Sequence, residues 1–286
     1  MTTTAGRTTT RPTSTSSTGF GLLLLSLAGL LALNTALGPL GVGLIRYDFP
    51  DTIDHQLWGL EIVTVLLVVP VLVAAAVLTI RGRPGGPLLA IGPAAYTTYM
   101  FVQYVLGPEY DHYSLTVLFH LALVTLSGAL ALWAWRLSAD VAPPAATGRQ
   151  RRVRGALLLG FAAFVLLRYT GGLVGAWSGS AIGAEFAASR TFFWSIFLLD
   201  LGVVVPLTVV AGVGAVAGRP WADRAVLAVL GWYALVPPSV AAMAVVMLVR
   251  DDPHASIASV TLLSVASLVF GAVAYRVFRS SVQREE

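Results

Sequence analysis

The sequence predicts an all-α fold, a polytopic membrane bundle of about eight transmembrane helices, on three observations. Of its 286 residues, 57% are hydrophobic and 11% are charged, and the mean hydropathy is +0.80. A soluble domain of this length cannot bury so much apolar surface. Apolar segments long enough to cross a bilayer divide the chain. The basic residues gather in the turns between these segments, where they indicate topology.

The chain opens with residues 1–18, which are mostly Thr and Ser and which we interpret as a disordered cytoplasmic tail. The first apolar segment, 20–44, has the length of a membrane span, and a cleaved secretory signal is the competing interpretation. Seven further spans are predicted, at 58–80, 86–107, 114–136, 155–176, 191–217, 222–249 and 255–278.

All 18 basic residues are arginine. If the helices alternate in direction and the N-terminus lies inside, fourteen of these arginines fall on the cytoplasmic side, while most Asp and Glu residues of the turns fall outside. We therefore expect a multi-pass protein of the cell (inner or plasma) membrane with both termini cytoplasmic and the lipid bilayer as its partner.

The longest inner loop divides the chain into two halves. The predicted units are a first four-helix half 19–136, a basic cytoplasmic linker 137–154, a second four-helix half 155–279 and a cytoplasmic tail 280–286. Residues of the first half recur 136 positions later, as Trp58 and Trp194, Val68-Val69-Pro70 and Val204-Val205-Pro206, and Gly82-Arg83-Pro84 and Gly218-Arg219-Pro220. A four-plus-four tandem repeat predicts this pattern, but proline, glycine and arginine also recur at helix middles and inner turns of unrelated membrane proteins.

Four arginines of the linker, Arg149, Arg151, Arg152 and Arg154, stand close to the membrane. We interpret them as topology determinants that attract anionic lipid headgroups. No aromatic residues interleave with them, so nucleic acid is not expected as a partner.

Carboxylates stand beside a histidine in three outer turns. The groups are Asp51, Asp54 and His55; Glu109, Asp111 and His112; and Asp251, Asp252 and His254. Each group precedes an inward-running helix, where Asp caps free N–H groups, so we expect capping and no metal site. The chain has no cysteine, which excludes thiolate chemistry, and no cofactor is predicted.

Two ionisable residues lie at membrane depth in the second half. Asp200 lies about 13 Å and Arg168 about 10–12 Å below the outer surface, at 1.5 Å per residue. An unpaired charge at this depth is costly, so we expect Arg168 and Asp200 to form an ion pair.

The third and fourth predicted helices carry a second polar surface. Its members are Tyr96, Tyr99 and Gln103 on one helix and Thr116, His120 and Ser127 on the next. Each set lies on one helix face. Glu61, only three residues into its predicted helix, either points toward the same space or lies at the headgroup level. Gln103 and His120 must find polar partners inside the membrane.

The same hairpin carries a resemblance. Its residues are Tyr96, Tyr99, Tyr104, Gly107-Pro108, Tyr110 and Leu126-Ser127. This aromatic pattern, over about 35 residues, resembles one in uncharacterised multi-pass bacterial membrane proteins. The resemblance implies the membrane class and carries no activity to any position.

The sequence favours a protein that binds or transports a small or lipid-like ligand. Pro70, Pro206 and Pro237-Pro238 should kink their helices at mid-membrane, and such breaks often border a cavity. The residues expected to line an outward pocket are Glu61, Tyr99, Gln103, His120, Arg168 and Asp200. An intramembrane enzyme that uses His120 with Asp200 or Glu61 on a lipid, and a non-catalytic subunit of a larger complex, are the alternatives; no catalytic residue is assigned.

Overall fold

The computed structural model describes residues 14–110, 113–139 and 146–282. These residues form helices and turns but no strand. The α-helices are α1 (Ser14–Leu37), α2 (Asp51–Val63), α3 (Val69–Ile80), α4 (Gly85–Leu106), α5 (Leu115–Leu137), α6 (Gly148–Arg168), α7 (Thr170–Ser178), α8 (Arg190–Leu199), α9 (Val205–Val216), α10 (Ala222–Tyr233), α11 (Val236–Val249) and α12 (Ile257–Val282). The π-helical turns η1 (Thr64–Val68) and η3 (Asp200–Val204) join α2 to α3 and α8 to α9, and a 3₁₀ turn, η2, spans Ala184–Phe186.

The fold is a multi-pass helical membrane bundle. Six helices or joined helices of the described chain are long and apolar enough to cross a membrane, or seven if the bent pair α6 and α7 forms one span. Eight spans were predicted from the sequence: counting α6 and α7 as one span leaves α4 as the predicted span that does not meet this criterion. Its 22 residues include three tyrosines, two threonines and a glutamine, and most of its side chains are buried against other helices. A helix enclosed by protein tolerates polar residues that a lipid-facing helix does not.

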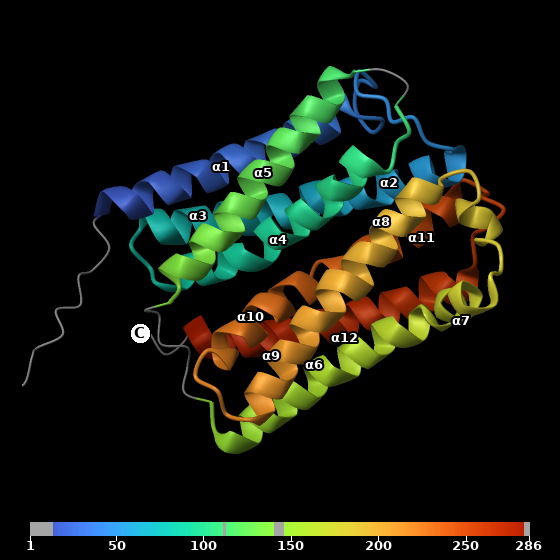
Figure 1. Cartoon of the computed structure of the whole chain (residues 1–286). Coiled ribbons are helices and arrows are strands. Elements are labelled where there is room, and N and C mark those ends of the chain that lie inside the picture. The colour runs from blue at the N-terminus through green and yellow to red at the C-terminus, as the bar shows by residue number, and fades with distance from the viewer. Residues whose placement is uncertain (1–13, 111–112, 140–145, 283–286) are drawn as a thin grey trace, which may run out of the picture.

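The helices gather into two groups that follow the order of the chain (Figure 1). In the first group α3 packs against α1 and α4, and α4 packs against α5. In the second group α9 packs against α6 and α10, and α12 packs against α10 and α11. The groups meet where α2 packs against α11 and where α4 packs against α10 and α8. The start of α1 and the end of α12 lie at the same end of the bundle (Figure 1).

Each π-helical turn ends two residues before a proline, Pro70 or Pro206. Proline lacks an N–H group, and its ring clashes with the carbonyl four residues earlier in a regular α-helix. The chain widens its turn before Pro70, where the N–H of Val69 donates to the carbonyl of Thr64. It does the same before Pro206, where the N–H of Val205 donates to the carbonyl of Asp200. The third kink is a break at 234–235, just before Pro237.

The turns that follow α3 and α9 also match. Gly82 and Gly218 adopt positive φ angles of 70° and 69°, a conformation that favours glycine. The N–H of Arg83 donates to the carbonyl of Leu78, and that of Arg219 to the carbonyl of Gly214, both at 2.9 Å. Both helices therefore end with the same hydrogen-bonded turn, 136 residues apart.

The first helix is shorter than the sequence predicted. The expected span 20–44 is apolar throughout, but α1 ends at Leu37, because the following residues are rich in glycine and contain a proline. Residues 38–50 form a non-helical segment that returns into the bundle, where Ile45 and Tyr47 are buried. We call residues 38–50 the return segment.

The basic region before the second half is partly helical. Thr147 and Gln150 form a reciprocal capping box, and α6 therefore begins at Gly148. Arg149 and Arg151 thus lie on the first turns of α6 and not in an irregular linker. Arg151 makes a two-pronged ion pair with Asp223 of α10, with a shortest N–O distance of 2.6 Å. Residues 140–145 of the expected linker lie outside the described residues.

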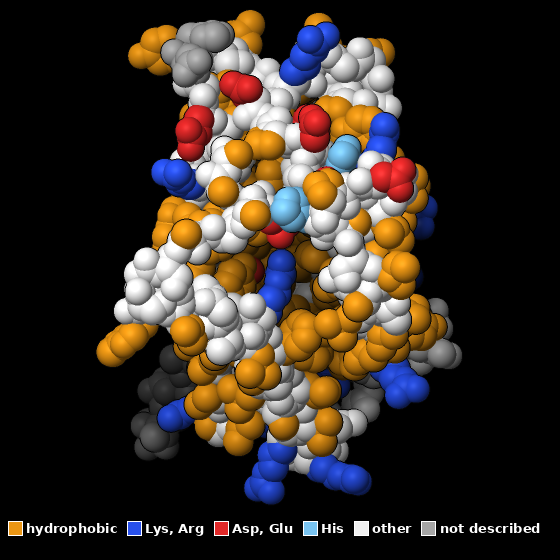
Figure 2. Space-filling view, turned by 90° about the vertical axis from the view of Figure 1, so that its right-hand side faces the viewer, with side chains coloured by type: hydrophobic (Ala, Val, Ile, Leu, Met, Phe, Trp, Pro, Cys, Tyr) orange, Lys and Arg blue, Asp and Glu red, His pale blue; other side chains and the backbone are white. Residues whose placement is uncertain are grey.

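Charged side chains gather toward the two ends of the face shown in Figure 2, and some basic ones lie among the acidic ones at the upper end. On the face shown, acidic and histidine side chains gather in the upper part, basic side chains mark the lower edge, and a hydrophobic band lies between. One basic side chain stands within that band, in a hollow of the surface (Figure 2). The apolar belt is what a bilayer-embedded protein presents to lipid.

Candidate functional site

Asp200 lies at the centre of a buried polar cluster in the second half. It opens η3, ten residues after the start of α8, or about 15 Å along the helix. The hydroxyl of Tyr99 donates to Oδ1 and the hydroxyl of Tyr169 donates to Oδ2, both at 2.6 Å. We call Tyr99, Tyr169 and Asp200 the tyrosine–aspartate cluster. Each oxygen of the Asp200 carboxyl therefore has a hydrogen-bond donor within this buried site.

Three helix discontinuities converge on this cluster. The chain bends by 47° between α6 and α7, at Tyr169. The second discontinuity is η3, which begins at Asp200. The third is the break between α10 and α11, which follows Trp232, whose ring packs edge-on against Tyr99 with centroids 5.4 Å apart. Broken helices that meet at membrane depth are typical of transporter binding sites.

The predicted ion pair between Arg168 and Asp200 is not formed. Within the described chain, the ion pairs closer than 4 Å join His55 to Asp252 and Arg151 to Asp223. Tyr169, the residue after Arg168, occupies the oxygen of Asp200 that an arginine would have used. Successive helix positions point about 100° apart, so Tyr169 is buried while Arg168 is exposed.

Arg168 has aromatic side chains beside it and no carboxylate partner. Its guanidinium carbon lies 5.8 Å from the centroid of the Tyr169 ring. Tyr169 contacts Phe197, with ring centroids 5.5 Å apart, and Phe197 contacts Trp194 at 5.4 Å. Trp194 is 48% exposed. The aromatic surface therefore leads from the tyrosine–aspartate cluster, past an uncompensated cation, to the outside of the bundle.

A second buried cluster lies in the first half. The hydroxyl of Tyr47 donates to Oε1 of Glu61 at 2.7 Å and accepts from Nδ2 of Asn34 at 3.2 Å. Nε2 of His120 lies 3.0 Å from Oδ1 of Asn34. We call these residues, with Tyr104, the glutamate–histidine cluster. Tyr104 lies among them, with its ring centroid 5.0 Å from that of Tyr47 and 5.4 Å from that of His120.

Glu61 lies deeper than the sequence predicted. We expected it three residues into a helix that begins at 58, but α2 begins at Asp51. Glu61 is therefore about 15 Å along the helix, as deep as Asp200 along α8, and only 2% of it is exposed. Glu61 is thus enclosed by protein, whichever depth of the membrane it occupies.

The six predicted site residues do not converge on one pocket in this structure. Glu61 and His120 belong to the glutamate–histidine cluster, whereas Tyr99 and Asp200 belong to the tyrosine–aspartate cluster. Arg168 lies beside the latter. Gln103 is buried, and its amide nitrogen lies 3.5 Å from the main-chain carbonyl of Tyr99.

The polar residues predicted on the third and fourth helices form hydrogen bonds to different neighbouring helices. The hydroxyl of Tyr96 bonds to Ser239 of α11 at 2.6 Å, and Ser127 bonds to Thr98 at 2.9 Å. These bonds tie helices together. His120 reaches Asn34 and contacts neither Glu61 nor Asp200, so no acid–base pair on His120 favours an enzyme.

Sequence reasoning missed Asn34, Tyr47, Tyr169 and Trp232. Asn34 carried a usable signal, because it is the one asparagine of the chain and stands within an apolar run. Tyr169 follows the intramembrane arginine directly. Tyr47 carried no signal, because the return segment looks apolar and its inward path is a tertiary feature.

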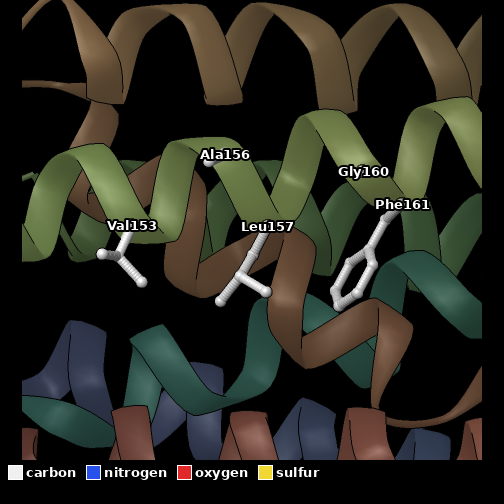
Figure 3. A pocket seen from close by; sticks show the side chains of 5 residues that line it. All are labelled: Val153, Ala156, Leu157, Gly160 and Phe161. Carbon is white, nitrogen blue, oxygen red and sulfur yellow. The ribbon is translucent and has the colours of Figure 1, made fainter.

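A shallow groove of about 460 Å³ lies along α6, away from both clusters (Figure 3). Val153, Ala156, Leu157, Gly160 and Phe161 line it. Val153, Leu157 and Phe161 point to the same side of the helix (Figure 3). The lining is apolar, so the groove suits hydrocarbon and not a polar ligand.

The carboxylates of the outer turns do not gather into a metal centre in the part of the chain that the structure describes. The capping expected of these carboxylates is not found at the helix starts that the structure describes: no side chain caps the start of α2, and α12 begins only at Ile257. Asp252 accepts from the N–H of His254 at 2.9 Å within the turn before α12, and its second oxygen lies 2.9 Å from Nδ1 of His55. Asp111 and His112 lie outside the described residues. Comparisons with known protein families, with curated proteins and with solved structures found no match for this chain.

Proposed function

We propose that this protein binds a lipid-like ligand with an anionic group at the tyrosine–aspartate cluster and moves it across the membrane. The observation that carries this proposal is Arg168, an exposed arginine at a helix break that forms no ion pair with any carboxylate among the residues that the structure describes. A cation at membrane depth needs compensation, and Asp200 already accepts from two tyrosine hydroxyls. An anionic headgroup supplies the missing charge, with the bidentate geometry that a guanidinium prefers.

The surroundings of Arg168 support an amphipathic ligand. Phe197 and Trp194 extend an aromatic surface from Tyr169 to the outside, where an acyl chain can lie beside it. Exposed apolar side chains on α7 and α12 flank the same half, among them Leu173, Val174 and Trp177. An amphipathic ligand can place its anionic headgroup on the guanidinium of Arg168 and its acyl chain against these apolar and aromatic side chains.

Native mass spectrometry tests the binding step. The protein in mild detergent is incubated with an equimolar mixture of phosphatidylglycerol and phosphatidylcholine, beside Arg168→Gln and the control Arg219→Gln. Wild type and the control should retain phosphatidylglycerol preferentially, and Arg168→Gln should retain roughly tenfold less, the value of one charge-assisted hydrogen bond. A small organic anion carried from the cell and lost from Arg168→Gln alone also supports the site. Equal retention by Arg168→Gln and Arg219→Gln contradicts it.

Transport is tested separately in liposomes. Fluorescent phosphatidylglycerol should exchange between leaflets faster with wild type than with Arg168→Gln at equal incorporation. Exchange at the same rate in both, despite a binding difference, means that the site binds without transporting.

We further propose eight spans with both termini cytoplasmic, in the cell membrane. The shared end of α1 and α12 in Figure 1 supports an even number of crossings. Because the chain has no cysteine, single cysteines can be introduced without background. Arg83→Cys should react with a membrane-impermeant maleimide only after the cells are broken, and Asp51→Cys should react in intact cells. The reverse labelling pattern would show that the topology is opposite to the one proposed.

We propose that the two halves are copies of one four-helix unit. The matching π-helical turns and the matching turns at Gly82 and Gly218 support this, together with the equivalent packing of α1 on α3 and of α6 on α9. Residues 1–142 and 143–286, expressed as separate chains in one cell, should assemble into a complex. Failure of both chains to insert in the membrane contradicts the four-helix unit.

A further inference from the structure

We propose that Glu61 is a proton-binding site, a carboxyl group that holds a proton in this conformation and exchanges it when the return segment moves away. The proposal concerns the glutamate–histidine cluster and does not depend on the ligand proposed above. A buried, exchangeable proton is what a membrane protein needs to couple its work to a proton gradient.

The hydrogen bonds of Glu61 differ from those of Asp200. Oε1 accepts from the Tyr47 hydroxyl, but Oε2 is buried and has no hydrogen-bond partner in the part of the chain that the structure describes. An ionised carboxylate accepts on both oxygens, and Asp200 has a donor on each. Burial disfavours the charged form of a carboxyl, and here one oxygen has no hydrogen-bond donor to stabilise a negative charge. The neutral, protonated form of Glu61 is therefore the more stable one.

The charges around Glu61 point the same way. The titratable groups near it are Tyr47 from the return segment, which donates to Oε1, and Tyr104 from α4, which packs against the Tyr47 ring. His120 of α5 reaches this cluster through Asn34. Asp54 lies two turns earlier on α2 and is itself acidic. α1 packs against η1 and α3, and α11 packs against α2, and neither α1 nor α11 carries an ionisable side chain. No arginine of the described chain lies within 4 Å of Glu61.

A directed chain of donors ends at Glu61. Nε2–H of His120 donates to Oδ1 of Asn34, Nδ2–H of Asn34 donates to Tyr47, and the Tyr47 hydroxyl donates to Oε1. Burial, and then the neighbouring Glu61, raise the pKa of Tyr47, so this phenol keeps its proton. With Oε1 occupied by a donor, Oε2 is the atom that carries the proton. On release, the O–H bond of the carboxyl breaks, and the proton passes to water.

The return segment covers the carboxyl. Gly38 lies so close that a Cβ there would stand 3.1 Å from each carboxyl oxygen. Ile45 and Tyr47 are buried, while Val42 and Leu44 are more than 70% exposed, so the segment touches the cluster on one side only. Its backbone is non-helical and includes Gly43 at a φ of 67°. Movement of this segment would expose Glu61 to water without unwinding a helix.

Infrared difference spectroscopy of the protein in lipid tests the proposal, with Glu61→Gln and Asp200→Asn as a matched pair at equal depth. Wild type at neutral pH should show the C=O stretch of a protonated, buried carboxyl. The band should be lost in Glu61→Gln and kept in Asp200→Asn. Gln replaces a neutral carboxyl with nearly the same shape and still accepts from Tyr47, so Glu61→Gln should fold.

Two further measurements keep the result clear. Tyr47→Phe removes the donor on Oε1 and should shift the band to higher frequency, which tests the assignment even if Glu61→Gln folds poorly. Transfer to D₂O should shift the band over time, because the proton exchanges. Absence of the band at neutral pH, its survival in folded Glu61→Gln, its loss in Asp200→Asn alone, or failure to exchange in D₂O would overturn the proposal.

Discussion

Thr64 and Asp200 each begin a five-residue π-helical turn, and they lie 136 positions apart in the sequence. The same backbone irregularity thus carries a hydroxyl in one half and a carboxylate in the other. Thr64 turns its hydroxyl onto the carbonyl of Leu60 at 2.8 Å, whereas Asp200 accepts from two tyrosines. The two turns share their backbone conformation but not their side-chain chemistry.

Removal of one residue from a π-helical turn should be tolerated better than removal of one from an α-helix. A π-helical turn holds one residue more than the α-helix around it, so deletion of Leu66 leaves the flanking helices in register. We expect that variant to fold, within about 3 kcal/mol of wild type. Deletion of Val73 rotates every later side chain of α3 by about 100° and should prevent folding.

Size-exclusion profiles of fluorescent fusions measure both deletions. A monodisperse peak from the Leu66 deletion and aggregation from the Val73 deletion are the expected pair. If both variants aggregate, the residues packed around the π-helical turn need its extra residue, and the expected tolerance of the Leu66 deletion is wrong.

Tyr169→Phe should destabilise the protein. It leaves Oδ2 of Asp200 without its donor in a buried site, at a cost of about 1–3 kcal/mol in the free energy of unfolding. The control is Tyr113→Phe, since Tyr113 is fully exposed. Denaturant unfolding in micelles compares the two. A similar small effect from both would mean that Asp200 is neutral and does not need the second donor.

Gly59→Ala should disrupt the contact between the halves. A Cβ on Gly59 would stand 2.3 Å from the backbone nitrogen of Met243 in α11, and backbone cannot move aside easily. We expect a loss of about 1–3 kcal/mol in stability. Gly29→Ala in α1 is the control, because it meets nothing within 4 Å and should gain up to about 1 kcal/mol from helix propensity. Thermal unfolding in detergent measures both, and equal midpoints would contradict the close approach.

Asp252 should make stability depend on pH. Burial alone raises the pKa of Asp252, but hydrogen bonds from the N–H of His254 and the side chain of His55 outweigh it, so the pKa lies below its ordinary value. The unfolded chain then binds the proton more tightly than the folded one. The stabilisation is present above the ordinary pKa of about 3.9 and is lost as the pH falls through the lower folded value.

The measurement is the thermal midpoint of wild type and Asp252→Asn, from about pH 7 to about pH 3. Wild type should be the more stable near neutrality, and the gap should narrow on acidification. A gap that is constant over this range would mean that the carboxylate charge contributes nothing.

The features that depend on local chemistry were predictable from the sequence. Pro70 and Pro206 indicated where the backbone departs from the α-helix, and the two π-helical turns lie at these places. The positive φ angles of Gly82 and Gly218 likewise follow from a missing Cβ, which acts within a few residues. The helix cap predicted at Asp252 is wrong, because α12 begins only at Ile257 and Asp252 accepts from His254 within the turn before it.

Features that depend on distant partners were not predictable. Hydropathy predicted that the first span ends at residue 44, whereas α1 ends at Leu37. A hydropathy average does not take into account that glycine and proline can end a helix within an apolar run. The ion pair of Arg168 with Asp200 was a sound inference from charge and depth. It was wrong because Tyr99, about 100 residues earlier, and Tyr169 reach the carboxylate first.

The two hydroxyls on Asp200 come from different sides of the molecule. Tyr99 belongs to α4 of the first half, whereas Tyr169 and Asp200 belong to the second half. If the halves rock against each other, the bond from Tyr99 stretches and that from Tyr169 travels with its acceptor. Loss of the Tyr99 bond then leaves one oxygen of the Asp200 carboxyl without its donor, so any movement between α4 and η3 changes the polarity of this buried site.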